Sequence, residues 1–218
     1  MIKKQYALII FDWDGTLYDS FHSTLSYLKQ AVIDLKFPMF DDTEFTALSG
    51  LSIAHIIDAL YSDLPEANRE MLKIRYRFHA LLHQNSIILY PDAKNVLESL
   101  RSQGYLLGIA TGKGAEGLAR DLAALKMDSW FDVTRTADKT FPKPHPLMLE
   151  QIMEILNVPA KKTLFIGDSI LDMQTATNAH VDAIGVCHMP DQRPLLLEHG
   201  AIAAISTLTE LMDYLDIK

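Results

Sequence analysis

Aspartates follow two apolar segments that lie far apart in the chain: Asp12 and Asp14 in YALIIFDWDGT, and Asp168 and Asp172 in TLFIGDSILD. Carboxylates brought to one place repel each other, and burying them is costly unless a cation accompanies them. Their oxygens are hard ligands that suit octahedral Mg²⁺, which binds through one or two carboxylates, waters and a phosphate. We therefore expect Asp12 and Asp168, with a backbone carbonyl near Asp14, to hold Mg²⁺ beside a phosphate substrate.

A hydroxyl, a glycine and a lysine follow other apolar segments. Thr111 and Gly112 come after YLLGIA, and Lys143 lies in FPKPHP, on a loop after WFDVTR. Loops at the carboxyl ends of parallel strands gather along one edge of a sheet, so these residues are expected to meet the aspartates there. Thr111 would offer phosphate its hydroxyl, Gly112 an unobstructed backbone amide, and Lys143 a fixed positive charge. Trp13 would add its backbone amide, while its ring packs or borders a helical insertion.

The two aspartates of the first segment have different expected roles. Phosphoryl transfer depends mostly on positioning and electrostatic stabilisation, which this set of groups supplies. Asp12, at the very end of the first predicted strand, would attack the phosphorus and form an aspartyl-phosphate. Asp14 would protonate the leaving oxygen and then take a proton from the attacking water. Asp172, also in the predicted ligand set, has three open roles: metal binding through water, orientation of the site, or stabilisation of its helix.

Apolar, β-rich segments alternate with helical patterns along most of the chain. This alternation predicts an α/β fold with a parallel sheet flanked by helices. The predicted strands are YALIIF, YLLGIA, WFDVTR, TLFIG, DAIGV and AIAAI. Residues 115–125 and 147–156 carry apolar side chains at helical spacing and predict two of the covering helices.

One region interrupts this alternation. Between residues 21 and 86 no segment is typical of a strand, which predicts a small all-helical insertion after the first strand. The predicted domains are a catalytic core of residues 1–17 and 88–218 and a helical cap of residues 18–87. Within the cap, Arg75, His79 and His83 lie along one side of a predicted helix. A solvated face is the favoured interpretation of this stripe, and a face turned to the substrate is the alternative.

The composition limits the classes of partner. The net charge of −8 over 218 residues argues against nucleic acid, because nucleic-acid binding draws on clustered lysine and arginine. The apolar runs are too short to span a bilayer, and no export signal is evident, so we expect a cytoplasmic protein that does not enter a membrane. The single cysteine, Cys187, fits a reducing compartment and is expected to be buried and inert. A monomer is the default expectation.

Four motifs together resemble the haloacid dehalogenase-like (HAD) hydrolase superfamily: DWDGTLYDS, the threonine of ATGKG, the lysine of KPHP, and GDSILDMQTATNA. Their order and approximate spacing cover almost the whole chain. The insertion between the first two motifs is similar to the branch that contains phosphoglycolate phosphatases and β-phosphoglucomutases. The resemblance implies a Rossmann-like core, a mobile helical cap, a magnesium ion, and Asp12 as nucleophile. Gly112 stands where many members have Asn, and His180 where Gly is usual.

The expected activity is hydrolysis of a small phosphomonoester, phosphoglycolate-like or a sugar phosphate, by a Mg²⁺-dependent phosphatase. Asp14 disfavours a dehalogenase, which has no leaving-group oxygen to protonate. A phosphomutase of the same superfamily and a non-catalytic phosphate-binding regulator remain alternatives. A phosphonate-cleaving enzyme would need a cap lysine, and neither Lys36 nor Lys73 has a supporting neighbourhood. Specificity is expected to come from the cap, including residues 48–52 and Arg75 or His79.

Overall fold

A computed structural model describes the chain except for residues 1–5, 49–52, 83–86, 190–191 and 218. Contacts between residues divide the chain into two compact units. The core unit consists of Met1–Tyr18 and Ile87–Lys218, and the cap unit of Asp19–Ser86. All six strands belong to the core unit, whereas the elements of the cap unit are helices.

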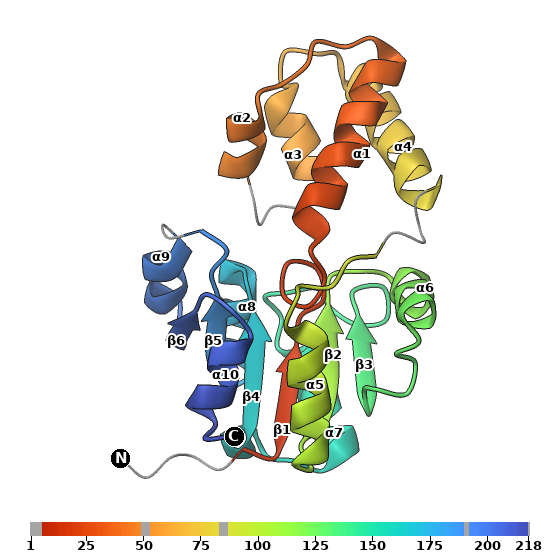
Figure 1. Ribbon diagram of the computed structural model, residues 1–218. Helices are drawn as coiled ribbons and strands as arrows, with labels where there is room; N and C mark the ends of the chain where they lie inside the picture. The colour runs from red at the N-terminus through yellow and green to blue at the C-terminus, as the bar shows by residue number, and fades with distance from the viewer. Residues whose placement is uncertain (1–5, 49–52, 83–86, 190–191, 218) are drawn as a thin grey trace. The chain divides into compact units, whose positions relative to one another are not determined.

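The core unit is built on a six-stranded parallel sheet with the order β3-β2-β1-β4-β5-β6 (Figure 1). The order reverses between β1 and β4, and open α/β sheets bind ligands at such a point, beyond the carboxyl ends of the strands. Each of the six predicted segments overlaps one strand, so the predicted α/β class is confirmed. The strands are β1 (Leu8–Phe11), β2 (Leu106–Thr111), β3 (Val133–Thr136), β4 (Thr163–Gly167), β5 (Asp182–Val186) and β6 (Ala201–Ile205).

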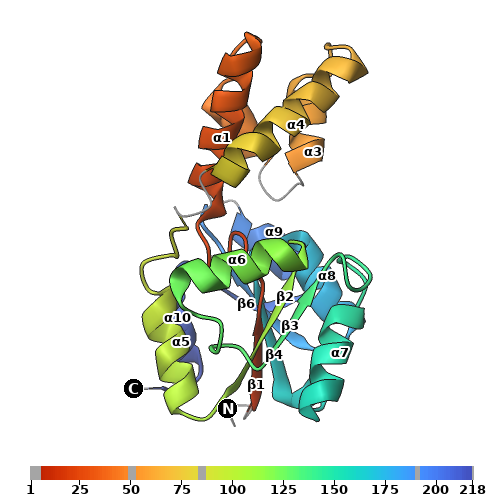
Figure 2. The ribbon, with the colours of Figure 1, turned by 90° about the vertical axis from the view of Figure 1, so that its right-hand side faces the viewer.

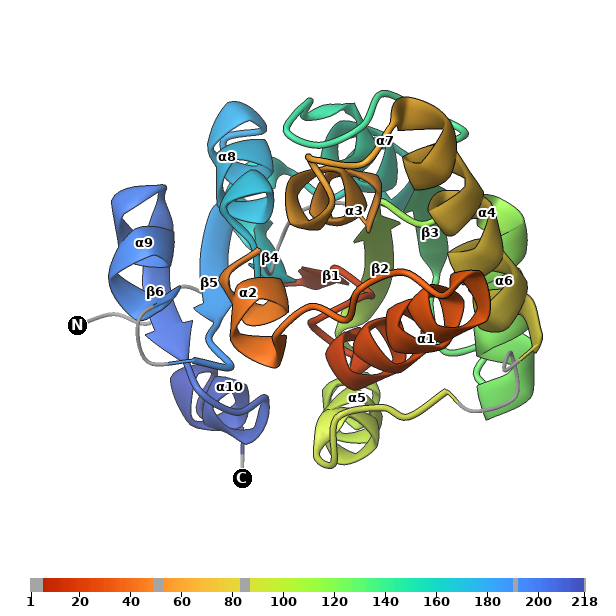
Figure 3. The same cartoon turned by 90° about the horizontal axis from the view of Figure 1, so that it is seen from above.

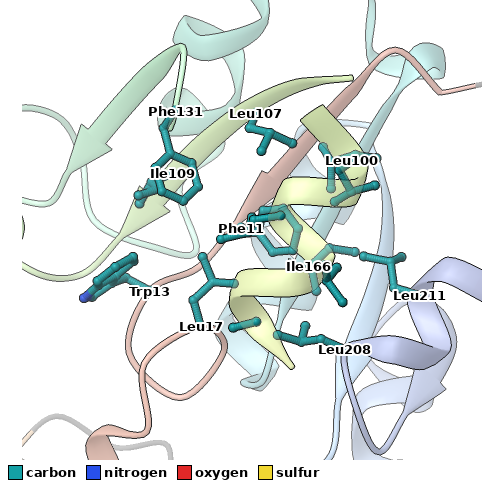
Figure 4. Packing of buried hydrophobic residues seen from close by; sticks show 14 of the residues in the cluster. Phe11, Trp13, Leu17, Leu100, Leu107, Ile109, Phe131, Ile166, Leu208 and Leu211 are labelled. Carbon is teal, nitrogen blue, oxygen red and sulfur yellow. The ribbon is translucent and has the colours of Figure 1, made fainter. Parts of the chain in front are cut away.

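Strand β1 lies at the centre of the sheet and is buried on both faces, which explains why its sequence is a continuous apolar run. Ile9 and Phe11 pack into the hydrophobic cluster on one face of the sheet. Leu8 and Ile10 pack into the cluster on the other face. Figure 4 shows Phe11 among side chains of β2, β4 and the helices that cover its face. The carboxyl end of β1 is therefore fixed by packing from both sides.

Helices cover both faces of the sheet, as the alternating pattern predicts. One face carries α5 (Ala93–Ser102), α6 (Ala115–Leu125) and α10 (Thr209–Tyr214). The other carries α7 (Leu147–Leu156), α8 (Ile170–Asn178) and α9 (Gln192–Glu198). Figure 2 shows α5 and α10 on one side of the sheet and α7 and α8 on the other. A short 3-10 helix, Ala160–Lys162, precedes β4, and Cys187 after β5 is buried, as expected.

The cap unit contains four helices in its described residues: α1 (Ser20–Leu35), α2 (Asp42–Ala47), α3 (Ile53–Leu60) and α4 (Glu66–Leu82). Helices α1 and α4 lie side by side (Figures 1 and 3). The unit has a hydrophobic cluster of its own, in which Leu28, Ile57 and Leu72 are fully buried. No helix in the described part of the chain is long and apolar enough to cross a membrane.

The expected solvated stripe on α4 is wrong for His79, which is 8% exposed. Its Nε2 lies 2.8 Å from Asp34 Oδ2, and Arg75 Nε lies 2.5 Å from the same oxygen. These contacts hold the pKa of Asp34 below its usual range, with the His79 hydrogen bond as the largest cause. The stripe faces α1, whose Asp34 supplies the acceptor. His83 and most of the 48–52 turn lie outside the described residues.

Candidate active site

Asp12 is placed by the end of β1. Its backbone N–H donates to the Ile166 carbonyl at 2.8 Å, so the pairing of β1 with β4 continues as far as this residue. The chain then turns sharply: the Trp13 carbonyl accepts from the Tyr18 amide, and Gly15 has a φ of +84°. Glycine adopts this conformation without steric cost. The turn leaves the Asp12 carboxylate at the carboxyl edge of the sheet, with its side chain only 11% exposed.

Asp168 follows β4 and is fixed by the same turn. Its Oδ1 accepts a hydrogen bond from Thr16 Oγ1 at 2.9 Å. A Cβ added at Gly15 would lie 2.7 Å from the Asp168 Cγ, so a larger residue at this position would displace the carboxylate. Gly15 and Thr16 thus provide space and a hydrogen bond for a side chain more than 150 residues away in sequence.

Asp172 is held by the start of α8. Ser169 and Asp172 form a capping box, in which the Ser169 hydroxyl and amide donate to Asp172 Oδ2 at 2.6 and 3.0 Å. The side chain of Asp172 is fully buried. A Cβ added at Gly167 would lie 2.5 Å from both Cβ and Cγ of Asp172, so the glycine allows this close approach.

Lys143 joins two of the three carboxylates. Its Nζ lies 2.8 Å from Asp12 Oδ1 and 2.5 Å from Asp172 Oδ1, and its side chain is only 8% exposed. The ammonium also lies over the Phe165 ring, 5.3 Å from the centroid. Burial disfavours the charge of this lysine, but Asp12 and Asp172 outweigh burial and hold its pKa above the usual range. Lys143 is therefore a fixed cation at the carboxyl ends of β1 and β4.

One ammonium does not balance the three carboxylates. Asp12, Asp168 and Asp172 each offer an oxygen within 4.8 Å of the other two. Burial raises the pKa of Asp12 to about 7, with Lys143 opposing the shift and Asp172 adding to it. Burial and repulsion from Asp172 and Asp12 raise the pKa of Asp168 well above its usual value. A cluster of oxygen ligands with excess negative charge fits a divalent metal ion, whose charge would reverse these shifts.

The buried oxygen of Asp12 supports the same fit. In the described part of the chain, Asp12 Oδ1 has no hydrogen-bond partner of good geometry, although the Lys143 ammonium is near. A buried oxygen of this kind is costly unless it receives a further ligand. The donors present are thus suited in number, charge and type to a hard divalent cation.

Thr111 and Gly112 lie at the end of the neighbouring strand. Phe11, the last residue of β1, pairs with Ile109, and β2 continues for two more residues to Thr111 at the same edge of the sheet. Thr111 is buried, and its Oγ1 accepts from the Lys113 amide at 3.1 Å. Gly112 is exposed, and an added Cβ there would meet nothing within 4 Å. The space beside the Gly112 Cα is therefore open, and the expected use of its backbone amide stays a prediction.

Trp13 packs its ring into the core, one of the two expected positions (Figure 4). The indole meets the Phe131 ring edge-on at 6.4 Å, and its Nε1 donates to Asp121 Oδ2 at 2.9 Å. The ring is fully buried. Any contact of Trp13 with substrate would have to use the backbone amide.

Asp14 has a partner that the sequence interpretation missed. Lys113 Nζ lies 3.1 Å from Asp14 Oδ1 and 2.8 Å from Asp121 Oδ2. Burial opposes the charge of Lys113, but the two aspartates hold its pKa above the usual range. The sequence did hold one sign of this contact: Asp121 is a charged residue on the apolar side of its helix, directly before Leu122, and such a residue needs a partner. The hydrogen bonds of Thr16 to Asp168 and of Ser169 to Asp172 were not predicted either.

Comparison with known proteins assigns the family. The family model described as "Haloacid dehalogenase-like hydrolase" matches residues 9–186. A probable phosphatase, IndB, of Dickeya dadantii is 31% identical over 85% of this chain and 84% of its own length. A phosphoglycolate phosphatase of Colwellia psychrerythraea is 27% identical over 97% of this chain and 98% of its own.

A solved structure agrees with these sequence relatives. The crystal structure of a hydrolase from Pseudomonas syringae has a TM-score of 0.75 at 26% identity, covering 97% of this chain and 98% of that one. The matched family segment includes Asp12, Thr111, Lys143, Asp168 and Asp172. The predicted family and enzyme class are thus confirmed: the chain belongs to the haloacid dehalogenase-like hydrolases, as a phosphatase of the phosphoglycolate phosphatase-like branch with a helical cap.

Proposed function

We propose that the protein is a Mg²⁺-dependent phosphatase that hydrolyses a small phosphomonoester by way of a phosphorylated Asp12. One observation carries the proposal. The buried Asp12 carboxylate lies at the end of β1, 2.8 Å from the Lys143 ammonium and within 4.8 Å of oxygens of Asp168 and Asp172. A candidate nucleophile, a cation and candidate metal ligands therefore lie together at the edge of the sheet where ligands bind.

The reaction proceeds in two steps, phosphorylation of Asp12 and hydrolysis of phospho-Asp12. An Asp12 oxygen attacks phosphorus, the ester P–O bond breaks, and the leaving oxygen takes a proton from Asp14. Asp14 then takes a proton from a water molecule, whose oxygen attacks the phosphorus of phospho-Asp12. The bond between phosphorus and Asp12 breaks, which releases inorganic phosphate and restores both carboxyl groups. Dividing the hydrolysis in this way replaces one difficult displacement by two easier ones.

The remaining groups hold the phosphate and balance its charge. Thr111 supplies its hydroxyl, Gly112 and Trp13 supply backbone amides, and Lys143 supplies its ammonium. Mg²⁺, bound by Asp12, Asp168 and a backbone carbonyl near Asp14, would neutralise charge on the phosphate oxygens.

The proposed role of Asp172 is to hold Lys143 within this charged group. Its Oδ2 accepts from Ser169 and its Oδ1 pairs with Lys143. Both oxygens are thus engaged, which favours orientation of the site over direct metal binding. Asp172 also adds negative charge to the cluster, so it would strengthen metal binding without a direct bond.

The helical insertion provides the proposed cap. The proposed domains are a catalytic core of residues 1–17 and 88–218 and a cap of residues 18–87. Every proposed reacting group lies in the core. The cap would exclude water and select a small phosphate ester, phosphoglycolate-like or a sugar phosphate. We propose a monomer without a nucleic-acid or membrane partner. Lys73 does not favour a phosphonate-cleaving enzyme: it pairs with Glu70 and Asp58, which raise its pKa rather than activate the amine.

Release of inorganic phosphate from p-nitrophenyl phosphate and from phosphoglycolate, sugar phosphates and pyrophosphate tests the proposal. We expect Mg²⁺-dependent turnover that Asp12→Asn reduces to background, because the nucleophile is lost. Asp14→Asn should lower the rate about 10²- to 10⁴-fold, the usual contribution of a general acid or base. Matched circular dichroism spectra would show that the variants are folded.

Three outcomes would contradict parts of the proposal. No turnover of any ester would favour the non-catalytic regulator. Transfer of phosphate within a sugar phosphate, without net release, would favour a phosphomutase. Full activity in Asp12→Asn would exclude Asp12 as the nucleophile.

A further inference from the structure

A second lysine lies near the reacting groups but contacts a different carboxylate from Lys143. Lys113 follows β2, and its Nζ is 3.1 and 3.4 Å from the two oxygens of Asp14. The same ammonium lies 2.8 Å from Asp121 Oδ2 on α6. Lys143, by contrast, pairs with Asp12 and Asp172. The two lysines therefore serve two separate sets of carboxylates.

Asp121 anchors Lys113 to the core. It is 9% exposed and also accepts the indole N–H of Trp13 at 2.9 Å. Trp13 is fully buried and directly precedes Asp14 in the chain. Asp14 is thus tied to the core twice, once through the backbone of its neighbour and once through Lys113 and Asp121. The buried Asp121 carboxylate holds both Lys113 and Trp13 in place, because losing either partner would leave its oxygens without a full set of hydrogen bonds.

The stem of Lys113 is packed as well as its charged end. A Cβ added at Gly117 would lie 3.3 to 3.6 Å from three stem carbons of Lys113, so the glycine leaves room for the side chain. The ammonium lies 5.1 Å from the centroid of the Tyr18 ring. The Lys113 amide donates to Thr111 Oγ1 at 3.1 Å, which fixes the backbone. The lysine is therefore held along its length rather than extended into solvent.

We propose that Lys113, held by Asp121, is a positioning residue that fixes the carboxylate of Asp14 for its two proton transfers. The inference rests on the proposed function, which assigns those transfers to Asp14. The side chain of Asp14 is 37% exposed, so little apolar packing restrains it. Contacts from one ammonium to both oxygens restrict its rotation, and a fixed orientation is a large part of catalytic efficiency.

Lys113 keeps its own protons in both steps. Asp14 gives a proton to the ester oxygen as the P–O bond breaks, and it takes one from water as water attacks phospho-Asp12. Removing Lys113 should therefore leave attack by Asp12 intact and weaken only the steps in which Asp14 moves a proton. Leaving-group dependence separates these effects, because a good leaving group departs without a proton.

The test compares p-nitrophenyl phosphate with phenyl phosphate, which have similar shapes and different leaving groups. The kcat/KM value reports steps up to departure of the leaving group. In Lys113→Met we expect kcat/KM to fall about tenfold or more for phenyl phosphate and less than about threefold for p-nitrophenyl phosphate. The kcat for p-nitrophenyl phosphate should also fall, because hydrolysis of phospho-Asp12 still needs Asp14 as the base.

Asp121→Asn provides a second variant that nearly preserves side-chain shape. It should shift the ratio of the two kcat/KM values in the same direction, since the charge that holds Lys113 is lost. The double variant should have the same ratio of kcat/KM values as Lys113→Met alone, because both changes disrupt the same contact between Lys113 and Asp14. Arg120→Met removes an exposed cation one residue from Asp121 and is the matched control, with an unchanged ratio expected.

An equal fall in kcat/KM for both esters, in either single variant with a native-like melting temperature, would overturn the positioning role. An unchanged value for phenyl phosphate in Lys113→Met would do the same. Failure of the proposed function is distinct, because it would appear as absent turnover in the native protein with every ester.

Discussion

Asp12 shows how burial of one residue couples its chemistry to a metal ion. In the absence of metal, burial raises the pKa of Asp12 to about 7, above the value of about 4 for a free carboxyl group. Between these values the folded protein keeps a proton that the unfolded chain has lost, so its stability falls as the pH rises. Binding of Mg²⁺ requires the ionised carboxylate and releases the proton. We expect the Mg²⁺-induced rise in melting temperature to be larger near pH 8 than near pH 5.

Thermal unfolding of the native protein and Asp12→Asn, with and without Mg²⁺, measures this effect. The variant lacks the titrating group, so the pH dependence of the metal shift should become smaller. Asp168 contributes in the same direction, since its pKa is also raised. Equal metal shifts at both pH values in the native protein would contradict the expectation.

At the scale of an element, the connection from β4 to α8 depends on one glycine. A Cβ at Gly167 would meet the Cβ and Cγ of Asp172 at 2.5 Å, which no side chain can accommodate without movement. Gly167→Ala should therefore destabilise the protein by about 1–3 kcal/mol, as overpacking of a buried position does. It should also lower phosphatase activity, because Asp172 pairs with Lys143.

Gly114→Ala is the matched control, since the same change at that position meets Asp138 only at 3.8 Å. Urea unfolding measures the stability of both variants, and release of inorganic phosphate measures their activity. Similar stability of Gly167→Ala and Gly114→Ala would contradict the expected overpacking at Gly167, and unchanged activity of Gly167→Ala would contradict the proposed role of Asp172 in holding Lys143.

Sequence reasoning recovered the strands because most of them, such as β1 (LIIF), are largely apolar and are followed by polar residues, although β3 (VTRT) is itself mostly polar. For the same reason it placed Asp12, Thr111 and Asp168 at strand ends. It did not find Lys113 as the partner of Asp14, or Asp121 as the partner of Trp13, because these contacts join residues about one hundred positions apart. Such pairs depend on how α6 packs on the sheet, and composition and spacing do not encode that packing directly.

At the scale of the whole molecule, the same limit applies to the cap. The absence of strand patterns predicted its helices, but the ion pairs of Asp34 with Arg75 and His79 depend on how α1 faces α4. Charged residues at helical spacing on α4 resembled a solvated face until the acceptor on α1 was known. The ion pairs between α1 and α4 are thus where the sequence interpretation of the cap was wrong.

The two compact units have separate hydrophobic clusters, which predicts that each can lose stability without the other. Leu72 is fully buried in the cap cluster, and Leu149 is fully buried in the cluster against the sheet. Replacing either by alanine should cost about 2–5 kcal/mol in its own unit. Amide hydrogen exchange followed by mass spectrometry would locate the loss.

In Leu72→Ala we expect faster exchange in α1 and α4, with β1 and β4 as protected as in the native protein. In Leu149→Ala the strands of the core should exchange faster and the cap helices should not, so each variant is the control for the other. Mg²⁺ should still raise the melting temperature of the core in Leu72→Ala, because the cluster of Asp12, Asp168 and Asp172 lies wholly in the core unit. Loss of protection in β1 and β4 on Leu72→Ala would instead show that the two units unfold as one, and the independence of the cap would be refuted.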